Sequence, residues 1–200
     1  IDVVIIVTPN DSHSAIADAF IQTEINVICE KPLTTNLDDA YRLYRSVLSN
    51  KVFFGLTHNY SGYSMVRQAA ALVCNGELGK IRVVQAEHAQ GAGVLPFELH
   101  DNQSLPWRGD PDVAGKAIVV SDIGTHAHHL VRYITGLEVL SVSAELSTHV
   151  PERKVYDNAQ ISMRLSDGAR GAIWASRVAT GNEHGLRIRV YGEKAGLEWH

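Results

Sequence analysis

The amino-acid sequence predicts an α/β protein with two parts, a parallel sheet followed by an α+β domain whose sheet is mostly antiparallel. Over residues 1–60, short apolar runs alternate with amphipathic stretches of helical spacing. After about residue 60, a helix, a strand and an irregular region lead to a second helix and then to successive strand-like runs separated by short turns. The first pattern is typical of parallel strands joined by helical crossovers, and the second of antiparallel neighbours.

Residues 1–60 are expected to form a β-α-β-α-β string. Residues 2–7 are apolar almost throughout, as in a parallel strand that is buried on both faces. Two stretches show helical spacing, with apolar positions at Ile16, Ala17, Phe20 and Ile21 and then at Leu37, Ala40, Tyr41, Tyr44 and Val47. The expected elements are strands at 2–7, 25–29 and 52–56, a helix at 13–23 and a helix from Thr35-Asn36 to about Leu48.

Residues 61–200 are expected to form a second domain. A helix at 62–74 ends at Asn75-Gly76, which is a C-cap signal, and 81–87 reads as a strand. Residues 90–120 contain several Gly and Pro and are predicted to be a loop. The remaining elements are a helix at 122–135 that stops at Gly136 and strands at 139–148, 158–165, 170–177 and 185–191.

The composition argues against several classes of function. A formal charge of −4 gives no broad basic surface, so we expect no nucleic-acid partner and no binding to an anionic membrane. The two cysteines, Cys29 and Cys74, form no disulfide framework, so we expect a reducing compartment, the cytoplasm. No apolar run reaches the roughly 20 residues of a membrane span.

Polar side chains follow two of the predicted strands directly. Thr8-Pro9-Asn10 comes after the first strand, and Glu30-Lys31-Pro32 after the second. Ligands of open parallel sheets bind outside the carboxyl ends of the strands, where a lysine can reach a small molecule. Pro32 gives a rigid bend, which can be cis. Ordinary turn chemistry remains an alternative for these residues, above all for Pro9 and Asn10.

The segment 121–129 concentrates a carboxylate and three histidines. If it is helical, Asp122 and His126 lie on one face, His129 follows on that face, and His128 points elsewhere. A carboxylate that orients an imidazole suits acid–base work. Two alternatives stay open: a capped helix start with partly exposed histidines, and a zinc site, although the spacing H-E-x-x-H is absent.

The predicted loop contains Trp107-Arg108. An arginine beside a large aromatic ring can bind a hydroxyl-rich or anionic ligand, or stack on a flat ring. A loop anchored by the burial of Trp107 is an equally good interpretation.

These motifs occur in one order, in which His58-Asn59-Tyr60 follows the third strand and precedes Trp107-Arg108 and Asp122-x-Gly-x-His126. That order resembles the Gfo/Idh/MocA family of nicotinamide-dependent oxidoreductases, over essentially the whole chain. The stretch from Trp107 to His126 looks most like the sugar- and polyol-dehydrogenase members.

The resemblance implies a Rossmann domain, present here as a partial parallel sheet over residues 1–60, and a substrate-binding domain over 61–200. It implies NAD or NADP as cofactor, a sugar-like or polyol-like substrate, and a homo-oligomer formed through the second sheet. Lys31, Asp122 and His126 would be the catalytic residues, with no metal ion. The cofactor-binding residues would be Thr8, Pro9, Asn10, His13, Glu30, Lys31, Pro32, Asn59, Trp107 and Arg108.

The sequence departs from the family at both ends. The Gly-rich pyrophosphate loop is not found, nor is the residue that selects NAD or NADP at the ribose 2′ position. Residues 2–7 would be the fourth strand of the family's sheet, and residues 199–200 lie within apparent sheet. We therefore expect a fragment that lacks the start of the Rossmann domain and a C-terminal portion.

The expected reaction is hydride transfer between a carbinol carbon and the nicotinamide ring. His126 would move the hydroxyl proton, Lys31 would stabilise the developing alkoxide, and Asp122 would fix the imidazole or a substrate hydroxyl. A non-catalytic ligand-sensing subunit on the same fold is one alternative. Metal-assisted hydrolysis with Asp122, His126 and His129 is the other.

Overall fold

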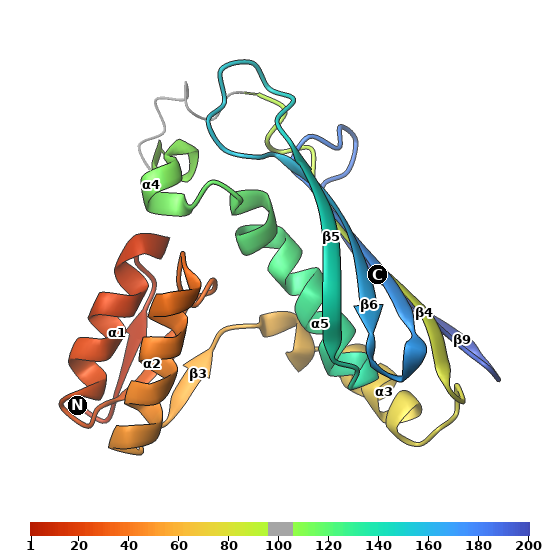
Figure 1. The fold of residues 1–200 in the computed structure, drawn as a ribbon, viewed down its shortest axis with the longest axis horizontal. Coiled ribbons are helices and arrows are strands. Elements are labelled where there is room, and N and C mark those ends of the chain that lie inside the picture. The colour runs from red at the N-terminus through yellow and green to blue at the C-terminus, as the bar shows by residue number, and fades with distance from the viewer. Residues whose placement is uncertain (96–105) are drawn as a thin grey trace.

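The computed structural model describes residues 1–95 and 106–200 and contains two sheets (Figure 1). The first has the order β1-β2-β3, and all its strands are parallel. The second has the order β5-β6-β7-β4-β8-β9, in which only β4 and β7 are parallel neighbours. Both predicted sheet types are therefore confirmed. No helix in the part that the structure describes is long and apolar enough to cross a membrane.

The elements of the N-terminal part follow the predicted order. They are β1 (Val3–Ile6), the 3₁₀ turn η1 (Asn10–Ser12), α1 (His13–Ile21), β2 (Asn26–Cys29), α2 (Leu37–Asn50) and β3 (Phe54–Leu56). Ile6 is paired with Cys29 and Cys29 with Leu56, so the three strands end at one level. The residues that follow each strand therefore meet at one edge of the sheet.

One expectation for this part is wrong. The strand β1 is not buried on both faces, because Val3 is 44% and Ile5 62% exposed on the face that no described helix covers. Of the apolar positions predicted on α2, Tyr41 and Tyr44 are exposed, whereas Val47 packs against the core of the first sheet. Leu43, which is 2% exposed, is the fully buried residue of α2 in that core.

The second part begins with the 3₁₀ turn η2 and continues to the end of the chain. Its elements are η2 (Asn59–Gly62), α3 (Ser64–Cys74), β4 (Ile81–Ala89), η4 (Pro106–Gly109), α4 (Pro111–Ala114), η5 (Val119–Gly124), α5 (Thr125–Thr135), β5 (Val139–Ser147), β6 (Asn158–Leu165), η6 (Ser166–Gly168), β7 (Arg170–Ser176), β8 (Gly185–Gly192) and β9 (Gly196–Trp199). The helix α5 ends at Gly136, whose φ of 68° is the left-handed conformation that a glycine C-cap adopts readily.

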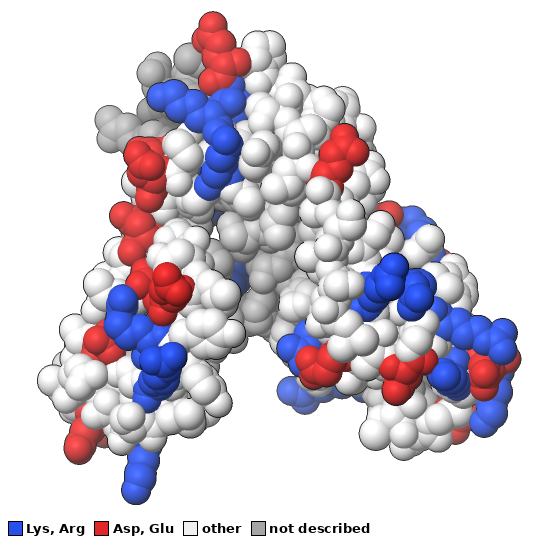
Figure 2. Space-filling model, in the orientation of Figure 1, with Lys and Arg blue, Asp and Glu red and all other residues white. Residues whose placement is uncertain are grey.

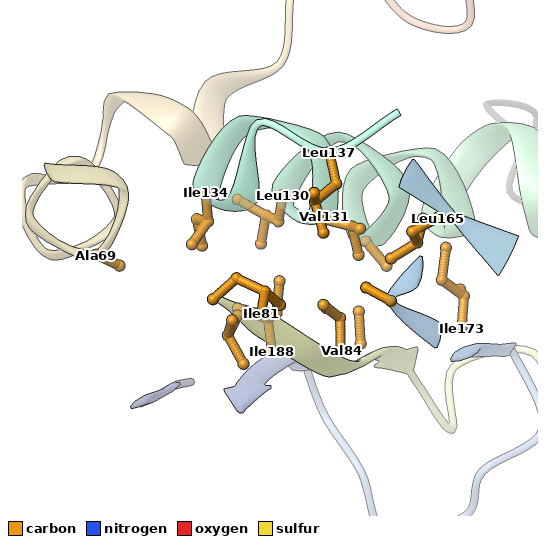
Figure 3. Close-up of a cluster of buried hydrophobic side chains, with 14 of the residues drawn as sticks. Ala69, Ile81, Val84, Leu130, Val131, Ile134, Leu137, Leu165, Ile173 and Ile188 are labelled. Atoms are coloured by element: carbon orange, nitrogen blue, oxygen red, sulfur yellow. The ribbon is translucent and has the colours of Figure 1, made fainter. Parts of the chain in front are cut away.

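The main core lies between α5 and one face of the six-stranded sheet (Figure 3). Leu130, Val131 and Ile134 point from α5 toward side chains of β4 and β8. Each of these three residues is at most 2% exposed, and burying a side chain of this size contributes about 1.5–3 kcal/mol. This packing holds α5, and with it the histidine-rich segment, in a fixed position on the sheet.

The predicted loop at 90–120 contains more structure than expected. Asp110 caps α4 by accepting a hydrogen bond from the backbone N of Asp112, and Pro111 occupies the first turn, where its missing N–H costs nothing. Residues 119–124 form a π-helical turn rather than the start of an α-helix. The middle of the predicted loop, residues 96–105, lies outside the described residues.

Candidate active site

A lysine from the first sheet meets an aspartate from the second part of the chain. Lys31 follows β2, and its Nζ donates hydrogen bonds to Asp122 Oδ1 at 2.5 Å and to the Asp122 backbone oxygen at 2.9 Å. Both side chains are 15% exposed. The peptide bond between Lys31 and Pro32 is cis. The space-filling view shows a hollow between these two parts of the molecule (Figure 2), with Lys/Arg and Asp/Glu side chains interspersed over that face.

The π-helical turn at 119–124 presents backbone acceptors to this contact. Thr125 N bonds to Val120 O five residues earlier, the wide spacing of a π-helix. Two successive carbonyls of this turn accept from side chains: Asp122 O from Lys31, and Ile123 O from His88 Nδ1 at 3.1 Å. Such turns occur often at functional sites. Here the two donors, Lys31 and His88, hold the turn and with it Asp122 in place.

Arg177, directly after β7, binds the other oxygen of the same carboxylate. Its guanidinium contacts Asp122 Oδ2, and its side chain is 14% exposed. Arg177 is not among the site residues predicted from the sequence. The available signal was its position as the last residue of the predicted strand 170–177, but nothing in the sequence indicates that this strand pairs with β4 in parallel and so ends beside Asp122.

The expected contact between Asp122 and His126 does not form. Both carboxylate oxygens of Asp122 face cations, and the π-helical turn shifts this residue away from the face that a regular α-helix would give it. His126 is 7% exposed and packs edge-on against Tyr60, with the ring centroids 4.8 Å apart. Its Nδ1 is buried and has no hydrogen-bond partner among the described residues. The chemistry at this edge therefore consists of a Lys31–Asp122–Arg177 cluster and a separate, buried imidazole.

The other histidines surround His126. His58 lies edge-on to it at 5.8 Å and stacks on His129 with centroids 4.2 Å apart and planes 7° apart. Among the described residues, no group of three His, Cys, Asp or Glu side chains is arranged to hold a metal ion. The proposed zinc set of Asp122, His126 and His129 is thus not assembled.

Burial controls the protonation of this region. It lowers the pKa of His126 to about 3, with Lys31 and the neighbouring histidines adding to the effect. Burial likewise lowers the pKa of His58 and of His88 to about 4. These three imidazoles are therefore neutral at pH 7.

The pKa of Lys31 is lowered to about 8. Burial is the largest cause, and the cations Arg108 and Arg177 act in the same direction, whereas Glu30 opposes them. A lysine with this pKa is still mainly charged at pH 7, yet it gives up its proton far more readily than an exposed lysine does.

The residues after β1 take different positions. Thr8 and Pro9 are exposed at the sheet edge, whereas Asn10 is 5% exposed and its Nδ2 donates to Ala114 O at 3.1 Å. His13 is also buried, and its ring nitrogens lie 2.8 Å from Pro32 O and 2.9 Å from Thr8 O. His13 therefore ties the two strand-end loops together, and Asn10 ties the loop after β1 to α4.

The other residues predicted to bind the cofactor lie in different environments. Glu30 accepts a hydrogen bond of 2.5 Å from the Thr57 hydroxyl at the end of β3, and Asn59 is exposed. The guanidinium of Arg108 lies 4.7 Å from the centroid of the Trp107 ring. The Nε of Arg108 is buried and has no hydrogen-bond partner within residues 1–95 and 106–200, and burial lowers the pKa of this group. The charge of Arg108 acts on both Lys31 and Arg177, so it lies close to them.

Comparison with known proteins gives two family matches that together span nearly the whole chain. Residues 1–58 match the oxidoreductase family with an NAD-binding Rossmann fold, and residues 66–198 match the GFO/IDH/MocA C-terminal domain.

Individual relatives agree with these matches. The chain is 31% identical over 201 residues to an uncharacterized oxidoreductase, YfiI, of Bacillus subtilis, covering all of this chain and 51% of that protein. It is 28% identical over 220 residues to levoglucosan dehydrogenase of Pseudarthrobacter phenanthrenivorans, covering 98% of this chain and 55% of that one. The chain thus spans about half the length of the relatives it matches.

Solved structures give the same result for the fold. An inositol dehydrogenase homolog from Azotobacter vinelandii, complexed with NAD⁺, superposes with a TM-score of 0.95 at 37% identity. That match covers all of this chain and 51% of the other. Levoglucosan dehydrogenase in complex with NADH and L-sorbose matches with a TM-score of 0.92 at 29% identity, covering all of this chain and 54% of that one.

Proposed function

Because the chain belongs to the Gfo/Idh/MocA family of oxidoreductases, we propose that the protein is an NAD(P)-dependent dehydrogenase that acts on a hydroxyl of a sugar or polyol. One observation carries this proposal beyond family membership. Lys31 at the carboxyl end of β2 bonds to Asp122, and the buried imidazole of His126 lies on the helix that follows. Two proton-handling groups therefore flank the edge at which parallel sheets bind ligands.

The residues at this edge fit a nicotinamide cofactor. Thr8 and Pro9 are exposed after β1, and the buried Nε of Arg108 has no hydrogen-bond partner in the part of the chain that the structure describes. These residues would hold the cofactor together with Glu30 and Lys31. When bound, the nicotinamide ring supplies the acceptor or donor of the hydride.

His126 is the proposed proton acceptor in the oxidation, on the ground of its place beside Tyr60 on the helix that follows Asp122. Burial lowers its pKa to about 3, so the imidazole is neutral at pH 7 and carries a free nitrogen lone pair, but a pKa this low makes it a weak base until a bound substrate changes its surroundings. In the reduction, the same residue returns the proton. A positioned group of this kind contributes roughly 10²–10⁴-fold to the rate.

Lys31 is the proposed stabiliser of the developing alkoxide. Asp122 holds its ammonium group in place, and burial strengthens the attraction between that charge and a negative oxygen. Asp122 acts here as a positioning residue for Lys31 rather than as the partner of His126, because both carboxylate oxygens already contact cations.

The direct test is an assay of the full-length protein with NAD⁺ or NADP⁺ and a panel of sugars and polyols that includes myo-inositol and levoglucosan. The expected result is formation of the reduced cofactor with one or more members of the panel. Tight binding of a panel member without any reduction of cofactor would contradict the proposal and favour a ligand-sensing protein.

A further inference from the structure

A chain of side-chain hydrogen bonds runs from the π-helical turn to a tyrosine beside His126. His88 Nδ1 bonds to Ile123 O at 3.1 Å, and the amide nitrogen of Gln90 lies 3.2 Å from His88 Nε2. The same amide nitrogen lies 3.2 Å from His184 Nδ1, and His184 Nε2 lies 2.8 Å from the hydroxyl of Tyr60.

The pairing of β4 with β8 brings these residues together. The two strands are antiparallel, and Ala89 is opposite Gly185 in their last pair. Gln90 and His184 are the next residues along the two strands and therefore lie close to each other. Gly185 permits this approach, because a Cβ at that position would lie 2.8 Å from the backbone oxygen of Ala89. Tyr60 reaches the same point from η2.

The direction of every bond in the chain follows from its first acceptor. A carbonyl oxygen can only accept, so His88 carries its proton on Nδ1, and its Nε2 accepts from the Gln90 amide. The second amide proton of Gln90 then points at His184 Nδ1, which must accept, so His184 carries its proton on Nε2. His184 therefore donates to the oxygen of Tyr60.

The hydroxyl proton of Tyr60 has no acceptor among the described residues. Within residues 1–95 and 106–200, the hydroxyl has one hydrogen-bond partner, His184, and that partner donates. The ring of Tyr60 packs edge-on against His126, so the tyrosine that carries this donor is a direct neighbour of the proposed proton acceptor. Burial raises the pKa of Tyr60, so the group keeps its proton at neutral pH.

We propose that Tyr60 is a substrate-binding residue whose hydroxyl donates a hydrogen bond to a non-reacting hydroxyl oxygen of the sugar or polyol. This assignment rests on the proposed function. Lys31 and His126 interact with the reacting oxygen of the substrate, and Tyr60 binds a neighbouring hydroxyl oxygen. Gln90 and His184 are positioning residues, because they act only by keeping the Tyr60 hydroxyl proton free to be donated to the substrate.

Two variants of the full-length protein test the assignment, with myo-inositol and levoglucosan as probes. Tyr60→Phe removes the donor and should raise KM by about 3- to 10-fold with little change in kcat, as for the loss of one hydrogen bond to bound substrate. Gln90→Glu replaces the donor of the chain by an acceptor. His184 would then protonate Nδ1, its Nε2 would accept from Tyr60, and the hydroxyl proton would turn away from the substrate.

Gln90→Glu should therefore raise KM to a similar extent, although Tyr60 is still present. The double variant should show no further loss, because both changes remove the same hydrogen bond. Tyr63→Phe is the matched control: it removes a hydroxyl from the ring packed against Tyr60 and leaves the chain intact. An unchanged KM in Tyr60→Phe, or additive losses in the double variant, would overturn the assignment.

The direction of the chain can also be measured without turnover. Nitrogen NMR of the histidine side chains distinguishes a protonated from an unprotonated ring nitrogen. The expected result is His184 with the proton on Nε2 in the wild type and on Nδ1 in Gln90→Glu. The opposite tautomer in the wild type would overturn the assignment while leaving the proposed dehydrogenase function intact, whereas absence of turnover with the whole panel would remove both.

Discussion

Lys31 and Asp122 are separated by 91 positions in the chain, and their side chains meet at 2.5 Å. Lys31 extends from the first sheet, and Asp122 stands on a π-helical turn that leads into the helix of the second core. The contact therefore joins the predicted cofactor edge to the predicted substrate side.

Replacing Lys31 by Met should lower kcat/KM by roughly 10²-fold or more, because the alkoxide loses its buried cationic partner. Steady-state assays with the best panel substrate measure this. Lys154→Met, an exposed lysine outside the site, is the control and should retain wild-type kinetics. Turnover of Lys31→Met at the wild-type rate would remove Lys31 from the chemistry.

Replacing His126 by Ala should lower kcat by roughly 10²–10⁴-fold, because the proposed proton acceptor is removed. The exposed His128, two residues further along α5, provides the control variant His128→Asn. If both variants kept the wild-type kcat, proton transfer would have to proceed through another group.

The pH dependence of kcat/KM should report Lys31. Its charged form is the active one and its pKa is about 8, so kcat/KM should fall as the pH rises above about 8. Arg177 is one of the charges that lower this pKa, and it shares Asp122 with Lys31. Arg177→Met should therefore move the alkaline limb to higher pH.

Arg164→Met, an exposed arginine on β6, is the matched control for that profile and should leave the limb in place. If the alkaline limb of Arg177→Met moved to lower pH instead, the charge of Arg177 would be raising the pKa of Lys31 and not lowering it.

The folded protein should lose stability in acid because of its buried histidines. The pKa values of His58 and His88 are lowered to about 4, so between pH 6.5 and 4 the unfolded chain binds protons that the folded chain does not. Stability is fully present above pH 6.5 and falls as the pH drops toward 4, by at most about 1.4 kcal/mol per pH unit for each such group.

Urea unfolding midpoints at several pH values measure this loss. His88→Asn, whose amide can still donate to the Ile123 carbonyl, should reduce the slope by about one proton. A midpoint that stays constant from pH 7 to pH 5 would show that these imidazoles are accessible to protons in the folded state.

Replacing Asn10 by Ala should destabilise the protein by about 1–3 kcal/mol, because the buried carbonyl of Ala114 loses its donor. Asn50→Ala, which removes an amide donor to Ser46 O within a single helix, should cost less. Equal costs for the two variants would contradict the view that Asn10 braces the two parts of the chain.

The regular elements were predictable because their signals are local. The β-branched run at 25–29 and the Gly136 stop define a strand and a helix end whatever their neighbours are. The exposure of Tyr41 and Tyr44 was not predictable, because apolar spacing on a helix does not by itself reveal which side chains pack on the sheet. Tertiary packing decided in favour of Leu43.

The site was only partly predictable, for a related reason. Lys31, Asp122 and His126 stand in short motifs, but their contacts depend on distant donors. The π-helical turn at 119–124 is held by Lys31 and His88, and neither is near it in sequence. Arg177, Gln90 and His184 enter the site only through strand pairing, which no local pattern specifies.

The carbonyl acceptors of Asp122 and Ala114 have a consequence for how such proteins diversify. Both receive side-chain donors from the first sheet, Lys31 and Asn10, and a main-chain oxygen is present whatever residue occupies the position. A first sheet from another member that keeps this lysine and this asparagine can therefore dock on the same two oxygens. Exchange of the first 60 residues between relatives is therefore expected to preserve the docking of the first sheet on the second part of the chain.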